Sequence, residues 1–275
     1  MGQNSPSKWA KPGCQNQADE TELIYGRDLV AERFKIEAKQ STESEARQLI
    51  ECAKGTRDLP AISPMIRRAG YKPKVEDAKF DWYVACFSAE EDSLPLWRGF
   101  TRNCTGYAIG FRYTMQSGSL FSDAVHAAPR RVIYSEIEQD AVVRKTVEEA
   151  RRRLNDHEDL FGWTFPLVSI LTLKKPLFSS EQEWRVIWRK RHDSVETEMD
   201  GCTNGKWTPK GRITRDPPEC HYVGLPLSDW ELVKIICGPR SRLGPKSRKI
   251  RAALKEYRYQ SNNVEIVQSK CRLWR

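Results

Sequence analysis

Strict alternation of residue character marks the stretch from Ser180 to Trp188. One alternating set is mainly apolar and the other mainly charged: Gln182, Trp184, Val186 and Trp188 against Glu181, Glu183, Arg185 and Ile187. On a β-strand the two sets point to opposite faces of the sheet. We expect the Trp/Val set to face a core. The charged set then either faces water or lines a cleft, where two carboxylates about 6.5 Å apart act on one bound molecule.

Elsewhere the hydrophobic pattern predicts further strands and helices in alternation. The predicted strands are 82–88, 106–112, 131–134, 180–188, 230–239 and 263–267, and the predicted helices are 42–55, 94–100, 135–154 and 245–257. Capping boxes at Thr42 and Ser135 support two of the helices. The apolar run 165–173 is compatible with either helix or strand. Without βαβ regularity, this order predicts an α+β fold with a mixed, mostly antiparallel sheet and short flanking helices.

The first 80 residues differ in composition from the rest of the chain. Residues 1–20 are polar and are expected to fray, and 56–80 contain several prolines and glycines typical of a linker. We therefore predict an N-terminal tail, helix and linker over residues 1–80 and an α+β domain over residues 81–275. Residues 190–220 are unpatterned and predict a long surface insertion.

Composition excludes several classes of protein. The chain has 275 residues, of which 39% are hydrophobic and 30% charged, as in ordinary globular proteins. No apolar run is long enough for a membrane span and residues 1–17 lack a signal core, so we expect a cytosolic protein without a membrane partner. The eight cysteines include no CxxC pair, which argues for reduced thiols and against a metal site.

Five segments in order resemble the bacterial domain-of-unknown-function family numbered 2971. They contain a Ser-bearing strand, a Trp at a helix start, a Gly-x-x-Ile-Gly-Phe strand, a Glu-x-Glu-(Trp/Tyr)-Arg strand and a late Ile-Ile-x-Gly. Here they lie at residues 86–88, 96–98, 106–111, 181–185 and 235–239. The resemblance spans about residues 82–267. The family's usual N-terminal Asn-Asp-Pro-containing segment is not found in residues 1–81, which leaves any function that rests on it open.

The Glu-x-Glu strand with a nearby Ser and Arg is also similar to the Arg/Ser/Glu-x-Glu class of mono-ADP-ribosyltransferases. This resemblance implies an enzyme, of the kind found among toxins and phage-defence effectors, that takes NAD as substrate and transfers ADP-ribose to a protein or nucleic acid. Cleavage of the nicotinamide–ribose bond builds positive charge on the ribose, which a carboxylate stabilises. The resemblance implies that Glu183 binds the ribose 2′-OH, Glu181 orients or deprotonates the acceptor, and Ser88 supports Glu183. It also implies ligand-binding roles for six further residues: Trp97, Arg98, Tyr107, Gly110, Arg112 and Arg185.

Each of these residues also has a structural interpretation. Trp97 fits a core position, Gly110 fits close packing of neighbouring strands, and Arg185 fits an ion pair with Glu181 or Glu183. Binding of the pyrophosphate of NAD requires a planar group that donates two hydrogen bonds at once, as a guanidinium does. Arg98, Arg112 and Arg185 are all candidates for this role.

A basic segment near the C-terminus predicts a different activity. The net charge is +9, and the cations concentrate between residues 240 and 258, with one acid, Glu256. The candidate nucleic-acid contacts are Arg240, Arg242, Lys246, Arg248, Lys249, Arg251 and Lys255. They indicate either a solvated helix face or a non-catalytic module that binds nucleic acid or another partner.

Overall fold

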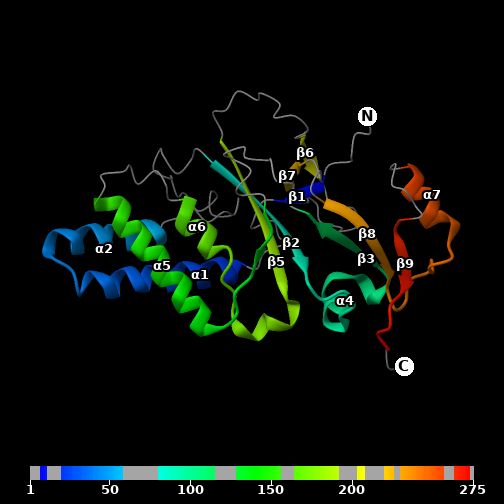
Figure 1. Ribbon diagram of the computed structural model, residues 1–275, viewed down its shortest axis with the longest axis horizontal. Helices are drawn as coiled ribbons and strands as arrows, with labels where there is room; N and C mark the ends of the chain where they lie inside the picture. Colours follow the sequence, from blue (N-terminus) through cyan, green and yellow to red (C-terminus); the bar gives the residue numbers. More distant parts are fainter. Residues whose placement is uncertain are drawn as a thin grey trace, which may run out of the picture.

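The computed structural model describes residues 7–10, 20–57, 80–114, 128–155, 164–191, 203–207, 220–225, 230–256 and 263–272. It confirms the predicted α+β class, with helices on one side of a central sheet and a second, smaller sheet on the other (Figure 1). The two sheets share no strand.

The larger sheet is antiparallel at every described strand pair. Its order is β4-β5-β2-β1-β7-β6, formed by β4 (Arg130–Arg131), β5 (Glu183–Arg191), β2 (Phe80–Ser88), β1 (Ser7–Ala10), β7 (Cys220–Leu225) and β6 (Thr203–Trp207). The longest pairing joins β2 to β5 and places Ser88 opposite Glu183 and Cys86 opposite Arg185. The predicted charged strand therefore lies beside the predicted Ser-bearing strand.

The smaller sheet combines antiparallel and parallel pairing. Its order is β3 (Tyr107–Tyr113), β8 (Trp230–Cys237) and β9 (Glu265–Gln268). Strands β3 and β8 are antiparallel, whereas β8 and β9 are parallel. A parallel neighbour requires a crossover connection, and α7 (Arg248–Glu256) occupies it. Between β2 and β3 the chain forms α4 (Leu94–Phe100), with Pro95 in its first turn as predicted, and the short η2 (Arg102–Cys104).

Four helices form a layer on one side of the larger sheet (Figure 1). They are α1 (Glu20–Ala38), α2 (Glu43–Arg57), α5 (Glu136–Asn155) and α6 (Thr164–Ile170). Their shared core contains Phe34 of α1, Leu49 of α2, Val147 of α5 and Ile170 of α6, all at most 1% exposed. Helices from the first 57 residues thus pack in one core with α5 and α6. Helix α5 lies where the pattern predicts the helix 135–154, whereas α1 is not among the predicted helices.

The two faces of the β2–β5 pair have different neighbours. On one face, Val84 and Ile187 pack with Leu167 and Leu171 from α6 and the turn after it. On the other face, Phe87 stacks on Trp230 of the smaller sheet with ring centroids 4.9 Å apart. Both faces are therefore covered, and the side chains of β5 cannot be divided into a buried set and a solvated set.

Several local predictions need correction. Residues 7–10, expected to fray, form a strand between β2 and β7 because their backbone groups complete both neighbouring ladders. The 42–55 helix continues to Arg57 instead of ending at Gly55, and the undecided run 165–173 is helical as far as Ile170. The expected insertion 190–220 contains the strand β6. The domain division at residue 81 stays a prediction.

Candidate functional site

The Glu-x-Glu segment straddles the start of β5. Glu181 ends the 3₁₀ helix η5 (Pro176–Glu181), and Glu183 is the first residue of the strand. Between them Gln182 adopts a left-handed conformation with φ of 43°. The two glutamates therefore do not alternate on one regular strand. Their side chains nevertheless converge, because both carboxylates contact the ammonium group of Lys174.

The predicted orientation of the strand is wrong in one respect. The charged set was expected to face water or an open cleft, yet Glu183 and Arg185 are only 6% and 5% exposed, while Trp184 is 36% exposed. The physical reason is the helical layer, which covers the charged face and supplies Glu22 from α1. Val186 is fully buried, as predicted for the apolar set.

Arg185 has partners on three sides. Its Nε lies 2.8 Å from Glu183 Oε1, and its Nη2 lies 3.0 Å from Glu183 Oε2, which makes the contact bidentate. Nη1 donates to the carbonyl oxygen of Leu171 at 2.7 Å, and Nη2 also donates to Glu22 Oε2 at 2.8 Å. Burial alone would raise the pKa of Glu183, but the hydrogen bond and charge of Arg185 outweigh it and hold the pKa below its ordinary value. Arg185 thus fits the structural alternative predicted for it.

Lys174 is the second cation of the site. Its Nζ lies 2.6 Å from Glu181 Oε2, 2.8 Å from Glu22 Oε1 and 3.1 Å from Glu183 Oε2. Burial would lower the pKa of Lys174, but bonds with Glu181 and Glu22 and the charge of Glu183 raise it above the ordinary value. Lys174 is therefore charged at neutral pH.

The backbone of Lys174 is fixed by a small network. Gln139 of α5 donates from its amide nitrogen to the carbonyl oxygens of Lys174 and Ile133, at 2.7 and 2.8 Å. Its amide oxygen accepts a hydrogen bond from the Tyr25 hydroxyl at 2.7 Å. Gln139 thereby connects α1 and α5 to the residues around the Ile133–Leu173 bridge. These contacts fix the position of Lys174 next to β5.

We call these five side chains the charge cluster: Glu22, Lys174, Glu181, Glu183 and Arg185. It contains three carboxylates and two cations, so negative charge is in excess. Both oxygens of Glu22 and of Glu183 are engaged. Glu181 is bound through Oε2 only, its Oε1 makes no hydrogen bond with any described residue, and its side chain is 24% exposed. Among the described residues, Glu181 is therefore the one carboxylate of the cluster with an oxygen that has no hydrogen-bond partner, on a partly exposed side chain.

Ser88 does not make the predicted contact with Glu183. Its hydroxyl donates to the backbone oxygen of Glu181 at 2.7 Å and accepts from the amide of Glu90 at 3.0 Å. The serine therefore fixes the backbone of Glu181 and leaves the Glu183 carboxylate to Arg185 and Lys174.

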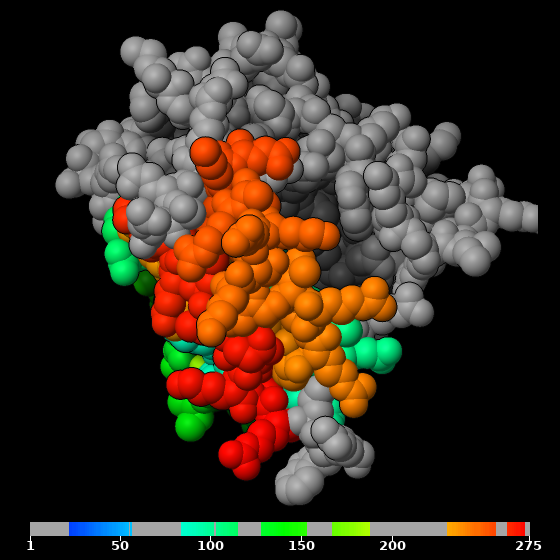
Figure 2. Space-filling model, turned by 90° about the vertical axis from the view of Figure 1, so that its right-hand side faces the viewer, coloured from blue at the N-terminus to red at the C-terminus, as the bar shows by residue number. Residues whose placement is uncertain are grey.

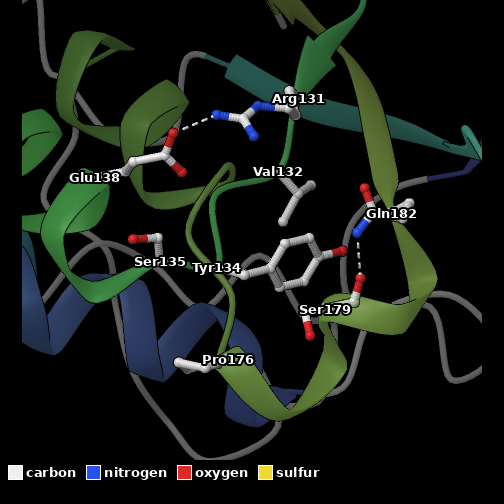
Figure 3. Close-up of a pocket in the computed structure, with 8 residues that line it drawn as sticks. All are labelled: Arg131, Val132, Tyr134, Ser135, Glu138, Pro176, Ser179 and Gln182. Atoms are coloured by element: carbon white, nitrogen blue, oxygen red, sulfur yellow. Dashed lines mark hydrogen bonds and ion pairs between the residues drawn. The ribbon is translucent and has the colours of Figure 1, made fainter.

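A pocket of about 340 Å³ adjoins the cluster (Figure 3). Its lining comes from β4, the start of α5 and η5: Arg131, Val132, Tyr134, Ser135, Glu138, Pro176, Ser179 and Gln182. The ring of Tyr134 lies at its centre, and an ion pair of 2.6 Å between Arg131 and Glu138 borders it. The Tyr134 hydroxyl accepts a hydrogen bond from the backbone amide of Glu183 at 3.1 Å. Burial and then the nearby Glu183 charge raise the pKa of Tyr134, so this residue links the pocket to the cluster.

The other predicted ligand-binding residues lie on α4 and β3, outside the charge cluster. Trp97 is 4% exposed and donates from its indole nitrogen to Asp92 at 2.7 Å, which fits its core interpretation. Arg98 is exposed on α4, and Tyr107 is 41% exposed on β3. At Gly110 a Cβ would lie 3.1 Å from that of Lys234, so the close approach predicted there is to a neighbouring strand.

Arg112 faces solvent and pairs across the strands with Glu231 at 3.1 Å. The structure therefore brings together Ser88, Glu181, Glu183 and Arg185 and leaves the rest of the predicted set elsewhere. The candidate nucleic-acid contacts of residues 240–255 are all exposed on and before α7.

Three residues of the site were missed from the sequence. Lys174 follows directly on an apolar run, and this position beside a buried segment is the one signal that could have indicated it. Glu22 lies in a segment without any motif, and Tyr134 reads as an ordinary strand residue. Their roles depend on packing between distant parts of the chain.

No group of His, Cys, Asp and Glu among the described residues is arranged to hold a metal ion. Within the same residues, no helix has the length and apolar character needed to cross a membrane. Cys52, Cys104 and Cys237 are buried free thiols.

Comparison with known proteins gives one family match. Residues 96–186 match the family described as "Protein of unknown function (DUF2971)". This span is narrower than the predicted 82–267, and it contains the pocket, Lys174 and the Glu-x-Glu segment but not Glu22 or Ser88. No curated protein and no solved structure matches the chain.

Proposed function

We propose that the protein is an ADP-ribosyltransferase-like enzyme that cleaves the nicotinamide–ribose bond of NAD and transfers ADP-ribose to a macromolecule. One observation carries the proposal: the charge cluster has an excess carboxylate, and the free oxygen of Glu181 belongs to it. A site with excess negative charge favours a ligand that becomes positively charged as it reacts. The ribose of NAD does so when its glycosidic bond breaks.

The residues take roles that follow from their exposure. In the proposed reaction the bond from ribose C1′ to the nicotinamide nitrogen breaks, and its electron pair leaves with the nicotinamide. The acceptor nucleophile bonds to C1′ and gives its proton to Glu181 Oε1, which no described residue occupies. Glu183 acts through its charge, because both of its oxygens are bound to Arg185 and Lys174.

The pocket supplies space of the size that small ligands need. About 340 Å³ lies at the lower end of the range for small-molecule sites. Its wall offers the Tyr134 ring for a flat group and the hydroxyls of Ser135 and Ser179 for hydrogen bonds (Figure 3). This volume fits one end of NAD, the nicotinamide and its ribose, better than the whole dinucleotide.

Nicotinamide release from NAD tests the proposal directly. The full chain is incubated with NAD and a protein or nucleic-acid acceptor, and nicotinamide is quantified by chromatography. We expect Glu181→Gln to lower the rate about 10²- to 10⁴-fold with an unchanged circular dichroism spectrum. Glu148→Gln, an exposed acid on α5 away from the cluster, is the matched control and keeps the wild-type rate.

Two results would contradict the proposal. One is the absence of nicotinamide release with every class of acceptor. The other is a Glu181→Gln variant that turns over at the wild-type rate, because the free carboxylate would then have no part in the reaction.

A further inference from the structure

The exposed cations of residues 240–255 form a surface that we call the basic surface. It consists of Arg240, Arg242, Lys246, Arg248, Lys249, Arg251 and Lys255. We infer that this surface binds the phosphate backbone of a double-stranded nucleic acid. The inference rests on residues outside the charge cluster and pocket and does not depend on the proposed function.

The first argument is the absence of internal charge pairing. None of the seven cations forms an ion pair with a described residue. On α2 and α5, by contrast, exposed cations such as Arg47, Lys54 and Arg144 each pair with an acid on their own helix. Helix α7 contains one acid, Glu256, at its end. Unpaired and clustered cations are the electrostatic signature of a phosphate-binding surface.

The second argument is the orientation of α7. Ile250 and Leu254 are buried at 9% and 5% exposure and pack in one core with Leu232 and Ile235 of β8. The opposite side of the helix presents its basic residues to solvent. Figure 2 shows this segment, coloured orange, on the face of the molecule that looks away from the helical layer.

A neighbouring segment extends the same surface. The C-terminal residues 263–272, coloured red in Figure 2, lie directly beside the orange residues. Lys270 and Arg272 in this segment are exposed, and the side chain of neither forms an ion pair with a described residue. The positive field is therefore wider than α7 itself.

The chemistry of the surface selects among anionic partners. An amphipathic helix that binds membranes inserts its apolar face, but the apolar face of α7 is buried in the protein core. Single-stranded nucleic acids are held by stacking on aromatic rings, and the sequence has no aromatic residue among the seven cations, the first one after them being Tyr257. A row of cations with no aromatic residue among them fits the regular phosphates of a duplex.

Fluorescence anisotropy with a labelled duplex of arbitrary sequence tests the inference. The test variant is Lys249→Gln with Arg251→Gln, and the matched control is Lys39→Gln with Lys145→Gln. The control lowers the net charge equally at exposed positions in the helical layer. Single-stranded oligonucleotides and vesicles containing anionic lipid serve as competing ligands.

We expect the wild-type chain to bind the duplex in a salt-dependent manner. The test variant weakens binding about tenfold or more at 50 mM salt and reduces the slope of log K against log salt by about 2. The control changes neither quantity, and circular dichroism shows both variants folded.

Several results would overturn the inference. They are no duplex binding at 50 mM salt, an equal loss in the test and control variants, or a test variant that binds like the wild type. Tighter binding to single strands or to vesicles than to the duplex would also overturn it and would assign the surface to that other ligand.

Discussion

Arg185 Nη2 lies 2.8 Å from Glu22 Oε2, although the two residues are 163 positions apart in the chain. The contact joins β5 to α1, and the same carboxylate also binds Lys174 through its other oxygen. One carboxylate from the N-terminal helix thus forms ion pairs with two buried cations. The stability of the sheet is thereby coupled to the docking of α1.

Replacement of Glu22 by Ala is expected to destabilise the protein strongly. Lys174 and Arg185 would each lose a partner while remaining buried, and breaking a buried ion pair from one side costs about 3–5 kcal/mol. Urea unfolding followed by circular dichroism measures the change. Glu43→Ala removes the exposed Glu43–Arg47 pair and should cost about 1 kcal/mol or less. Equal losses in the two variants would show that the Glu22 contacts contribute no more than a surface pair.

The charge cluster also predicts how stability depends on pH. The pKa of Glu183 in the folded protein lies below its ordinary value of 4.5, because the effect of Arg185 outweighs that of burial. Its contribution to the free energy of unfolding is therefore complete above the pKa that Glu183 has in the unfolded chain. This contribution is lost as the pH falls through 4.5 towards the pKa of Glu183 in the folded protein. The urea concentration at the unfolding midpoint should decrease as the pH is lowered from about 5 to about 3. It should decrease less steeply in the Glu183→Gln variant. Identical pH slopes for both proteins would contradict this assignment.

Asp92 is expected to hold the turn after β2 against the C-terminal segment. Its carboxylate accepts hydrogen bonds from Trp97 Nε1 at 2.7 Å, from Ser269 Oγ at 2.6 Å and from the Lys270 backbone amide at 2.6 Å. Asp92→Ala leaves these donors without their acceptor and should cost roughly 3 kcal/mol. Asp92→Asn keeps one acceptor oxygen and should cost less, as a comparison of urea midpoints would show. A larger loss in the Asn variant would contradict the hydrogen-bond explanation.

Cys52 is expected to resist alkylation in the folded protein. Its side chain is 2% exposed, and burial, followed by the charge of Glu51, raises its pKa to about 11. At pH 8 about one thiol in a thousand is then ionised, and the thiolate is the reactive form. Peptide mass spectrometry after iodoacetamide treatment should show slow labelling in buffer and rapid labelling in urea. Equal rates under the two conditions would mean that the thiol is accessible in the native fold.

The sequence by itself determined the α+β class and most of the regular elements around the site. The helix starts after Thr42 and Ser135, Pro95 in the first turn of α4 and the apolar strand of β8 follow from local signals, and each appears in the structure where the pattern places it. Local sequence also indicated the Glu-x-Glu segment and the basic surface. Short-range capping and periodicity depend on neighbours a few positions away, which the sequence shows directly.

Only the tertiary structure decided which face of β5 is covered and what the charged residues do there. Alternation defines two faces of a strand, but it does not say which of them receives a helical layer. Packing of α1 and α6 buried Glu183 and Arg185, brought in Glu22 and Lys174, and left the free oxygen on Glu181. The physical reason is that a buried charge is tolerated where partners from distant segments compensate it, and those partners meet only in the folded chain.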